Sequence, residues 1–346
     1  MVGAVVVCDG KVVGAAYHRR VGGPHAEVAA LRQAGQRARG ATLYVTLEPC
    51  AHHGRTPPCT EAVIAAGVGR VVACHRDPDP RVSGEGFARL EQAGIEVERD
   101  LLIDEAVYLN WRYLVATVLA RPAVSLKWAM SLDGRTATAT GESQWISSPA
   151  GRRWGLDQRE EHDATLIGIG TALSDDPQLN RRLGRANRPN VRVVLDRRLR
   201  LPPTARLLDV AGEVLVYTES TPATAAETWQ TLGNRGAQLI SMPSVTPAAV
   251  LKDLYGRGVQ SVLVEGGAQV ASAFAEAGLF DRVAVDLAPL LIGGVDALGA
   301  LGGNGFSPLA DVPRLADLRV ERRGGDVILK GFREQCLPDL YASVAG

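Results

Sequence analysis

Four residues near the N-terminus have the types and spacing needed for metal chemistry. His25 and Glu27 form a His-x-Glu pair at the start of a predicted helix, and Cys50 and Cys59 follow them in the chain. Cys59 comes directly after two prolines, at the start of another predicted helix, where the positive end of the helix dipole favours a thiolate. One histidine and two cysteines give zinc three ligands and leave its fourth position for water, which is the catalytic arrangement.

Glu27 stands beside a predicted ligand without being one. It can therefore carry a proton from a zinc-activated water to a leaving amine, as in zinc deaminases generally. Any one of these side chains alone would more often be an ordinary core or surface residue, but their joint pattern indicates zinc. Cys8 and Cys74 lie in apolar runs and are predicted core residues, and Cys336 lies in a polar tail without an evident partner.

The composition narrows the classes of function. A chain of 346 residues suggests two domains or three small ones, and its 38 basic and 38 acidic side chains cancel. This balance argues against nucleic acid or a membrane surface as a partner. The five cysteines are odd in number, which argues against a disulfide framework and favours a cytoplasmic protein. No apolar run is long enough to span a membrane, and the N-terminus lacks the basic region of a signal peptide.

The elements that must position these residues alternate between strands and helices. The turn Asp9-Gly10 joins two valine-rich runs into a predicted hairpin. Strands and helices then alternate, which predicts a sheet covered by helices. The predicted strands are 41–47, 70–74 and 95–97, and the predicted helices begin after Gly22-Gly23-Pro24 and span 60–66 and about 86–93.

A boundary is predicted near Arg121-Pro122, which divides the chain into domains 1–120 and 121–346. Beyond it the alternation starts again, so a second α/β domain is expected. Its predicted strands are 123–128, 164–168, 191–196, 214–217, 261–265, 282–287, 315–322 and 326–332, and its predicted helices span 148–160 and 268–277, with loop and helix near 221–228.

The spacing of the two cysteines separates this chain from the nucleoside and transfer-RNA deaminases, which use Cys-x-x-Cys. Here the segment is PCAHHGRTPPC, and it resembles the bifunctional RibD family of riboflavin biosynthesis. The resemblance covers nearly the whole chain. The other matching segments are VGAVVVCDGKVVG, GGPHAEVAAL, TLYVTLEPC, DPDPRVSGEG, LKWAMSLDGRTA, GESQWIS, GTALSDDPQL, VVLDRRLRLP and VLVEGGAQVASAF.

The resemblance implies a cytidine-deaminase-like α/β/α domain followed by a dihydrofolate-reductase-like α/β domain. The first would hydrolyse the 2-amino group of 2,5-diamino-6-(5-phosphoribosylamino)pyrimidin-4-one. The second would then reduce the ribosyl chain to ribityl with NADPH. It also implies that His25, Cys50 and Cys59 bind Zn²⁺ and that Glu27 moves the proton.

For the reductase half, the resemblance assigns two sets of residues by position. The cofactor positions are Ala129, Trp145, Thr171, Asp175, Arg197, Gly266, Gly267 and Ala268. The substrate positions are Ser143, Arg159, Leu179, Arg182 and Glu265.

Physical arguments support parts of this assignment. Gly266-Gly267 follows a predicted strand and opens a helix, so its N–H groups can approach a pyrophosphate, although a plain tight turn looks the same. Arg197, with Arg198 beside it, can pair with a 2′-phosphate or can simply be solvated. Arg159 and Arg182 can clamp the substrate's 5′-phosphate.

Two residues of this half keep open roles. Asp175, with Asp176, precedes a proline and can instead cap a helix or form a loop. Glu265 and Asp175 are also the candidate proton donors of the reduction.

The chain departs from the family pattern at its start. Family members carry a helix and a Pro-Asn-Pro segment before the Val2-Gly3 strand. Either the start codon is assigned too late and Met1 is an internal methionine, or the chain is truncated and the apolar face of 4–7 is expected to be uncovered. As written, the chain is expected to have weak or no deaminase activity, so a reductase-only protein is the alternative.

Two further functions and one assembly were weighed. A nucleic-acid or nucleoside deaminase conflicts with the long cysteine spacing, and a non-enzymatic zinc module conflicts with Glu27 beside an open three-ligand site. A phosphorylated pyrimidine is therefore the expected small-molecule partner. A homodimer is expected, because reductases of this fold commonly pair through sheet edges.

Overall fold

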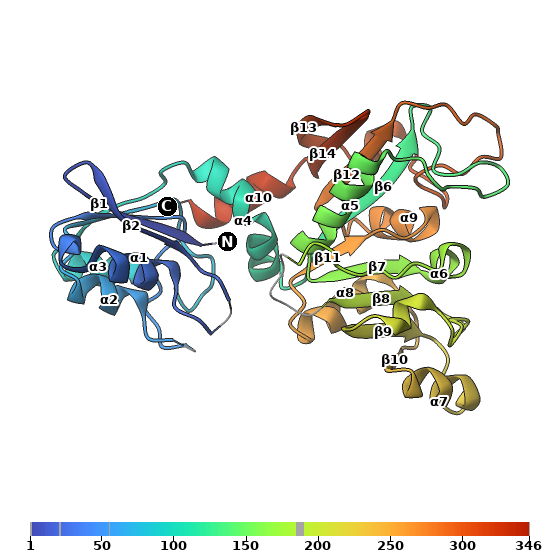
Figure 1. The fold of residues 1–346 in the computed structure, drawn as a ribbon, viewed down its shortest axis with the longest axis horizontal. Helices are drawn as coiled ribbons and strands as arrows, with labels where there is room; N and C mark the ends of the chain where they lie inside the picture. The colour runs from blue at the N-terminus through green and yellow to red at the C-terminus, as the bar shows by residue number, and fades with distance from the viewer. Residues whose placement is uncertain (1, 21, 55, 185–189, 346) are drawn as a thin grey trace. The chain divides into compact units, whose positions relative to one another are not determined.

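The computed structural model describes residues 2–20, 22–54, 56–184 and 190–345, and they form two compact units (Figure 1). The first unit comprises Met1–Leu119 together with Leu337–Gly346, and the second comprises Ala120–Cys336. The predicted division at residue 120 had assigned the whole tail to the second domain. In the structure the last ten residues are part of the first compact unit.

The first unit is built on a five-stranded sheet in the order β2-β1-β3-β4-β5. β1 pairs antiparallel with β2 and β3, whereas β3, β4 and β5 run parallel. The strands are β1 Gly3–Cys8, β2 Lys11–Tyr17, β3 Thr42–Val45, β4 Arg70–Ala73 and β5 Glu96–Glu98. The helices are α1 Ala26–Ala34, the 3₁₀ turn Gly35–Ala38, α2 Cys59–Ala65, α3 Glu85–Gln92, α4 Ile103–Val118 and α10 Cys336–Val344.

The core of the first unit explains why α1 lies close to the hairpin. A Cβ at Gly14 in β2 would collide with the Ala30 carbonyl of α1, so only glycine permits this approach. Ala4 and Val6 are buried in the same core as Ala30, while Val5 and Val7 on the opposite face of β1 are half-buried. The apolar face that carries Ala4 and Val6 was expected to be uncovered, and that expectation is wrong. The opposite face, with Val5 and Val7, is partly exposed.

The second unit is built on a nine-stranded sheet in the order β10-β9-β8-β7-β11-β6-β12-β14-β13. All neighbouring strands pair in parallel except β14, which pairs antiparallel with β12 and β13. The strands are β6 Ala123–Ser131, β7 Ala164–Gly168, β8 Val191–Leu195, β9 Glu213–Thr218, β10 Ala237–Ser241, β11 Ser261–Val264, β12 Arg282–Ala288, β13 Leu315–Arg323 and β14 Asp326–Arg333. The helices are α5 Pro149–Glu161, α6 Ile169–Asp175, α7 Ala226–Asn234, α8 Pro247–Gly256 and α9 Ala268–Glu276, with 3₁₀ turns at Arg206–Asp209 and Leu309–Asp311.

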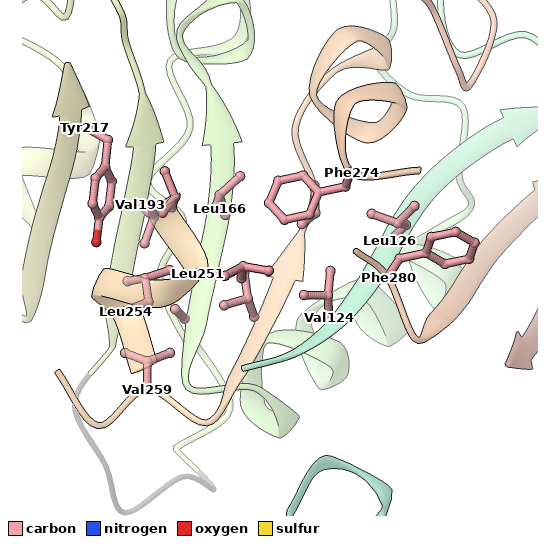
Figure 2. Packing of buried hydrophobic residues seen from close by; sticks show 14 of the residues in the cluster. Val124, Leu126, Leu166, Val193, Tyr217, Leu251, Leu254, Val259, Phe274 and Phe280 are labelled. Atoms are coloured by element: carbon pink, nitrogen blue, oxygen red, sulfur yellow. The ribbon is translucent and has the colours of Figure 1, made fainter. Parts of the chain in front are cut away.

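Helices cover both faces of this sheet, which is why its central strands are mainly apolar. Successive residues of a strand point to opposite faces, and in β8 Val193 enters one core cluster while Val194 enters another. Figure 2 shows the first cluster, where Leu251 of α8 and Phe274 of α9 pack on the strands. The second cluster holds buried residues of α6 and α7.

Several elements differ from the predictions. The helices α4, α6, α8 and α10 and the strand β10 had not been predicted, whereas most predicted strands lie within two residues of the observed ones. Cys336 is buried at the start of α10 instead of lying in a polar tail, and Cys8 and Cys74 are only half-buried. Among the described residues, none of the helices has the length and hydropathy needed to cross a bilayer.

Candidate active sites

The predicted zinc ligands come together in the first unit. One ligand atom from each of His25, Cys50 and Cys59 lies within 4.8 Å of the other two. His25 is the N-cap of α1, Cys59 is the first residue of α2, and Cys50 lies in the segment that follows β3. Nδ1 of His25 is 3.1 Å from Sγ of Cys59 and 3.6 Å from Sγ of Cys50. Two helix N-termini therefore converge on one point, where their dipoles favour thiolate ligands.

Hydrogen bonds among the three side chains shift their pKa values. Hydrogen bonding with Cys59 lowers the pKa of the Cys50 thiol well below its ordinary value. The same contact, with burial, raises the pKa of Cys59, and hydrogen bonding with Cys50 raises the pKa of His25. One imidazole and two thiolates form a donor set that zinc prefers, and zinc binding would displace the protons that these side chains carry.

Thr56 orients the histidine ligand. Its Oγ1 lies 3.2 Å from Nε2 of His25, on the opposite side of the ring from the two sulfurs. If Nε2–H donates to Thr56, Nδ1 carries the free lone pair and faces the thiols. Contacts of this kind fix the tautomer of a metal-binding histidine.

Glu27 lies in the first turn of α1 and is buried. Its Oε2 has no hydrogen-bond partner among the described residues, which is costly for a buried polar atom. Burial raises the pKa of its carboxyl. A buried carboxyl with a raised pKa, beside the predicted ligands, can act as a general acid and base.

The Cys50–Cys59 segment and the loop after β4 border the cluster. Nδ1 of His52 is buried and lacks a partner within the described part of the chain. The Arg81 guanidinium first, and His52 to a smaller extent, lower the pKa of Asp79. The Asp79 loop and the ligand segment are therefore neighbours. Arg55 of the ligand segment lies outside the described residues.

The second unit holds a buried ion pair at the carboxyl edge of its sheet. Arg159 donates from Nε and Nη2 to both oxygens of Glu265, at 2.6 to 3.2 Å. Their side chains are only 17% and 7% exposed. Burial raises the pKa of Glu265, but Arg159 and then Lys127 outweigh it, and the net pKa lies below its ordinary value. Glu265 is therefore ionised at neutral pH, which argues against it as the proton donor.

The expected phosphate clamp is not formed in this structure. The Arg159 guanidinium is occupied by Glu265, and exposed Arg182 donates to Asn180 and Gln178. The Leu183 N–H donates to Oε1 of Glu160, so the Arg182 segment is held at the end of α5 that carries Arg159. The two arginines lie near one end of the helix but do not form a pair.

Gly266 and Gly267 join β11 to α9 at the same sheet edge. A Cβ at Gly266 would lie 2.5 Å from Cα of Ile167, so this glycine permits close packing of β11 on β7. The Gly267 N–H donates to Oγ1 of Thr171 at 3.0 Å. The structure therefore brings the Thr171 and Gly267 cofactor positions into contact, but it uses the glycine N–H that had been expected to face a pyrophosphate.

The remaining predicted positions fall into three environments. Leu179 is buried in the α6–α7 core cluster, so only its backbone could meet a ligand. Asp175, Arg197 and Trp145 are exposed, and Ala129, Ser143 and Ala268 are half-buried. The Nε atom of Arg197 lies 3.6 Å from a carboxylate oxygen of Glu219, and Arg152 stacks on the Trp145 ring at 4.7 Å.

Comparison with known proteins identifies the family. Residues 122–329 match the RibD C-terminal domain, and residues 1–75 match the cytidine and deoxycytidylate deaminase zinc-binding region. The riboflavin biosynthesis protein RibD of Aquifex aeolicus is 40% identical over 95% of this chain and 90% of its own length. The Escherichia coli RibD is 42% identical, with 95% and 92% covered. The chain belongs to the RibD family.

Solved RibD structures confirm the predicted fold class. Acinetobacter baumannii RibD superposes with a TM-score of 0.86 at 40% identity, covering 96% of this chain and 92% of that one. A Thermotoga maritima protein described as a diaminohydroxyphosphoribosylaminopyrimidine deaminase and 5-amino-6-(5-phosphoribosylamino)uracil reductase gives 0.85 at 35% identity, with 96% and 91% covered. The chain thus has the zinc-binding deaminase and the NADPH-dependent reductase domains of RibD.

Sequence reasoning missed three residues that the RibD sites include or contact. Lys127 lies within reach of Glu265, and the signal was a lysine inside an apolar central strand, which needs a charged partner. Thr56 contacts the histidine ligand, but the sequence motif around it does not indicate toward which residue its side chain points. Glu48, two residues before Cys50, binds only backbone groups that lie far away in the sequence.

Proposed function

We propose that this protein deaminates 2,5-diamino-6-(5-phosphoribosylamino)pyrimidin-4-one in its first unit and reduces the ribosyl chain of the product in its second. The observation that carries the proposal is the His25, Cys50 and Cys59 cluster with buried Glu27 beside it, on the same chain as a RibD reductase domain. Because the ligands and the proton carrier are all in place, two activities are favoured over a reductase alone.

In the proposed deaminase, His25, Cys50 and Cys59 would hold zinc, which when bound would lower the pKa of a water to about 7. The Glu27 carboxylate would accept a proton from the attacking water and donate it to the departing amine. The unpaired Oε2 of Glu27 and its raised pKa support this role. The ring of His25 is held by Thr56, so the ligand geometry does not depend on the substrate.

In the proposed reductase, bound NADPH supplies the hydride, and the chain supplies alignment. The site fits a dinucleotide, because the carboxyl ends of β7 and β11 place Thr171, Gly267 and the start of α9 at one edge of the sheet. The other residues proposed to contact the cofactor are Ala129, Trp145, Asp175, Arg197, Gly266 and Ala268. The residues proposed to contact the substrate are Ser143, Leu179, Arg182 and the Arg159–Glu265 pair.

The test supplies purified, zinc-replete protein with the diaminopyrimidine phosphate, with and without NADPH, and follows product masses. A deaminated ribosyl product without NADPH and a deaminated ribityl product with it are expected. Glu27→Gln should lower deamination by at least about 10²-fold and leave reduction of the pre-deaminated compound unchanged. Reduction of only the pre-deaminated compound by the unmodified protein would refute the deaminase half.

We also infer a cytoplasmic homodimer. Thiolate zinc ligands need a reducing compartment, which supports the location. The edge strand β13 exposes Leu315, Leu318 and Val320, and unpaired sheet edges of this kind favour pairing. Sedimentation of the purified protein tests the assembly, and a monomer at micromolar concentration would refute it.

A further inference from the structure

A second buried carboxylate lies next to the zinc cluster and has no part in the proposed chemistry. Glu48 is 3% exposed and stands two residues before Cys50. Its Oε1 accepts hydrogen bonds from the N–H groups of Gly86 and Phe87, at 2.9 and 3.3 Å. Its Oε2 accepts hydrogen bonds from the N–H groups of Asp77 and Gly84, at 3.1 and 3.0 Å.

These four bonds use the whole accepting capacity of the side chain. A carboxylate has about four lone-pair sites, and here each oxygen receives two donors. An amide side chain would turn an NH₂ group toward two of those N–H groups and leave them buried without an acceptor. The site therefore requires a glutamate specifically.

The donors all belong to one segment, which we call the 77–87 loop, running from Asp77 through the first turn of α3. The same loop is held from the other side, because the Tyr113 hydroxyl of α4 donates to Asp77 at 2.6 Å. It lies against the ligand segment, since a Cβ at Gly86 would collide with the carbonyl oxygen of Pro49, directly before Cys50. His52 of that segment is also close enough to affect the pKa of Asp79.

We propose that Glu48 is a positioning residue of the zinc site, which binds the 77–87 loop to the Pro49–Cys50 segment and thereby fixes the direction of the Cys50 thiol. Because Glu48 is only two residues from Cys50, the four backbone bonds immobilise the chain that carries the ligand. The loop also becomes one rigid wall of the site. This inference rests on the proposed function for the identity of the metal.

The experiment measures zinc directly, without substrate. Zinc-loaded Glu48→Gln and a matched control, Glu61→Gln, are mixed with excess chromophoric chelator well below their unfolding temperatures. Glu61 also contacts α3, through an exposed ion pair with Arg89, and lies outside the site. Glu48→Gln should release zinc about 10- to 100-fold faster than the parent protein, and Glu61→Gln should match the parent.

A second variant disturbs the same contact from the loop. Gly86→Ala keeps the carboxylate but would place a Cβ 2.0 Å from the carbonyl oxygen of Pro49 and 2.9 Å from Oε1 of Glu48, so it should also speed zinc release. Hydrogen exchange should show lost protection of the amides at positions 77, 84 and 86 in Glu48→Gln. Zinc release within two-fold of the parent in both folded variants would overturn the proposal, even if the deamination assay succeeded. If the parent protein fails to deaminate the substrate while the two variants release zinc faster than the parent, only the proposed function is refuted.

Discussion

The Arg159–Glu265 ion pair gives a sharp prediction about the second unit. Arg159→Met keeps the length of the side chain but removes the charge that faces a carboxylate of 7% exposure. Removing one partner of a buried pair costs about 3–5 kcal/mol, because an uncompensated charge remains. Lys127 also faces Glu265 and supplies part of the missing charge, so we expect the lower end of that range.

The sign of the pH dependence follows from the pKa of Glu265. In the parent protein burial is outweighed by Arg159 and Lys127, so the folded-state pKa is depressed. The pair's stabilisation is thus present above the unfolded pKa and is lost as the pH falls through the folded pKa. In Arg159→Met burial dominates, so the carboxyl protonates as the pH falls and the penalty shrinks. The difference between variant and parent should narrow from about pH 7.5 to about pH 5.

The assay is hydrogen exchange with peptide resolution in a denaturant series, because the two units need not unfold together. Peptides from β6 and β7 report on the second unit. Arg153→Met, on an exposed position of the same helix, is the control and should change the free energy of unfolding by less than about 0.5 kcal/mol. The double variant with Glu265→Gln should recover part of the loss. A loss of the same size at both pH values would refute the reasoning.

Three further predictions concern both units. Thr56→Val removes the contact with Nε2 of His25 and should weaken zinc binding about 10- to 100-fold in a chelator competition, whereas unchanged affinity would exclude a role for the contact. Burial raises the pKa of Asp286 above its unfolded-state value, so the stability of the second unit falls as the pH rises through the folded-state pKa of this carboxyl. Asp286→Asn should flatten that fall, and unfolding measured at several pH values tests it. Gly266→Ala would place a Cβ 2.5 Å from Cα of Ile167 and should destabilise the second unit by about 1–3 kcal/mol in the same exchange assay; an unaltered stability would show that β11 can move away from β7.

Local signals in the sequence were enough for the family, the fold class and most strands. The metal ligands could be predicted because His25 and Cys59 each lie at the start of a helix. The Gly-Pro and Pro-Pro segments before them predict these helix starts. Those helices follow β2 and β3, the two strands that flank β1 in the sheet. The convergence itself had to be inferred from the resemblance.

Contacts between segments far apart in the sequence could not be predicted. Arg159 and Glu265 are 106 residues apart, and each alone was read as a ligand for substrate rather than as a partner for the other. Glu48 binds backbone groups, which leave no trace in the side-chain sequence. The helix α4 was missed because its buried face, which includes Trp111 and Leu114, lies in a segment without cap signals of the usual kind.

The return of the last ten residues to the first unit has a consequence for biosynthesis. Leu340 and Val344 of α10 are buried, and the Arg76 side chain donates to the Ser343 carbonyl of the same helix. The second unit is therefore an insertion between two pieces of the first. On the ribosome, where domains fold as they emerge, the deaminase unit cannot bury α10 until the whole reductase unit has been made. A stop codon or cleavage just after Gln335 would thus spare the sheet of the reductase and leave the deaminase unit, at the other end of the gene, incomplete.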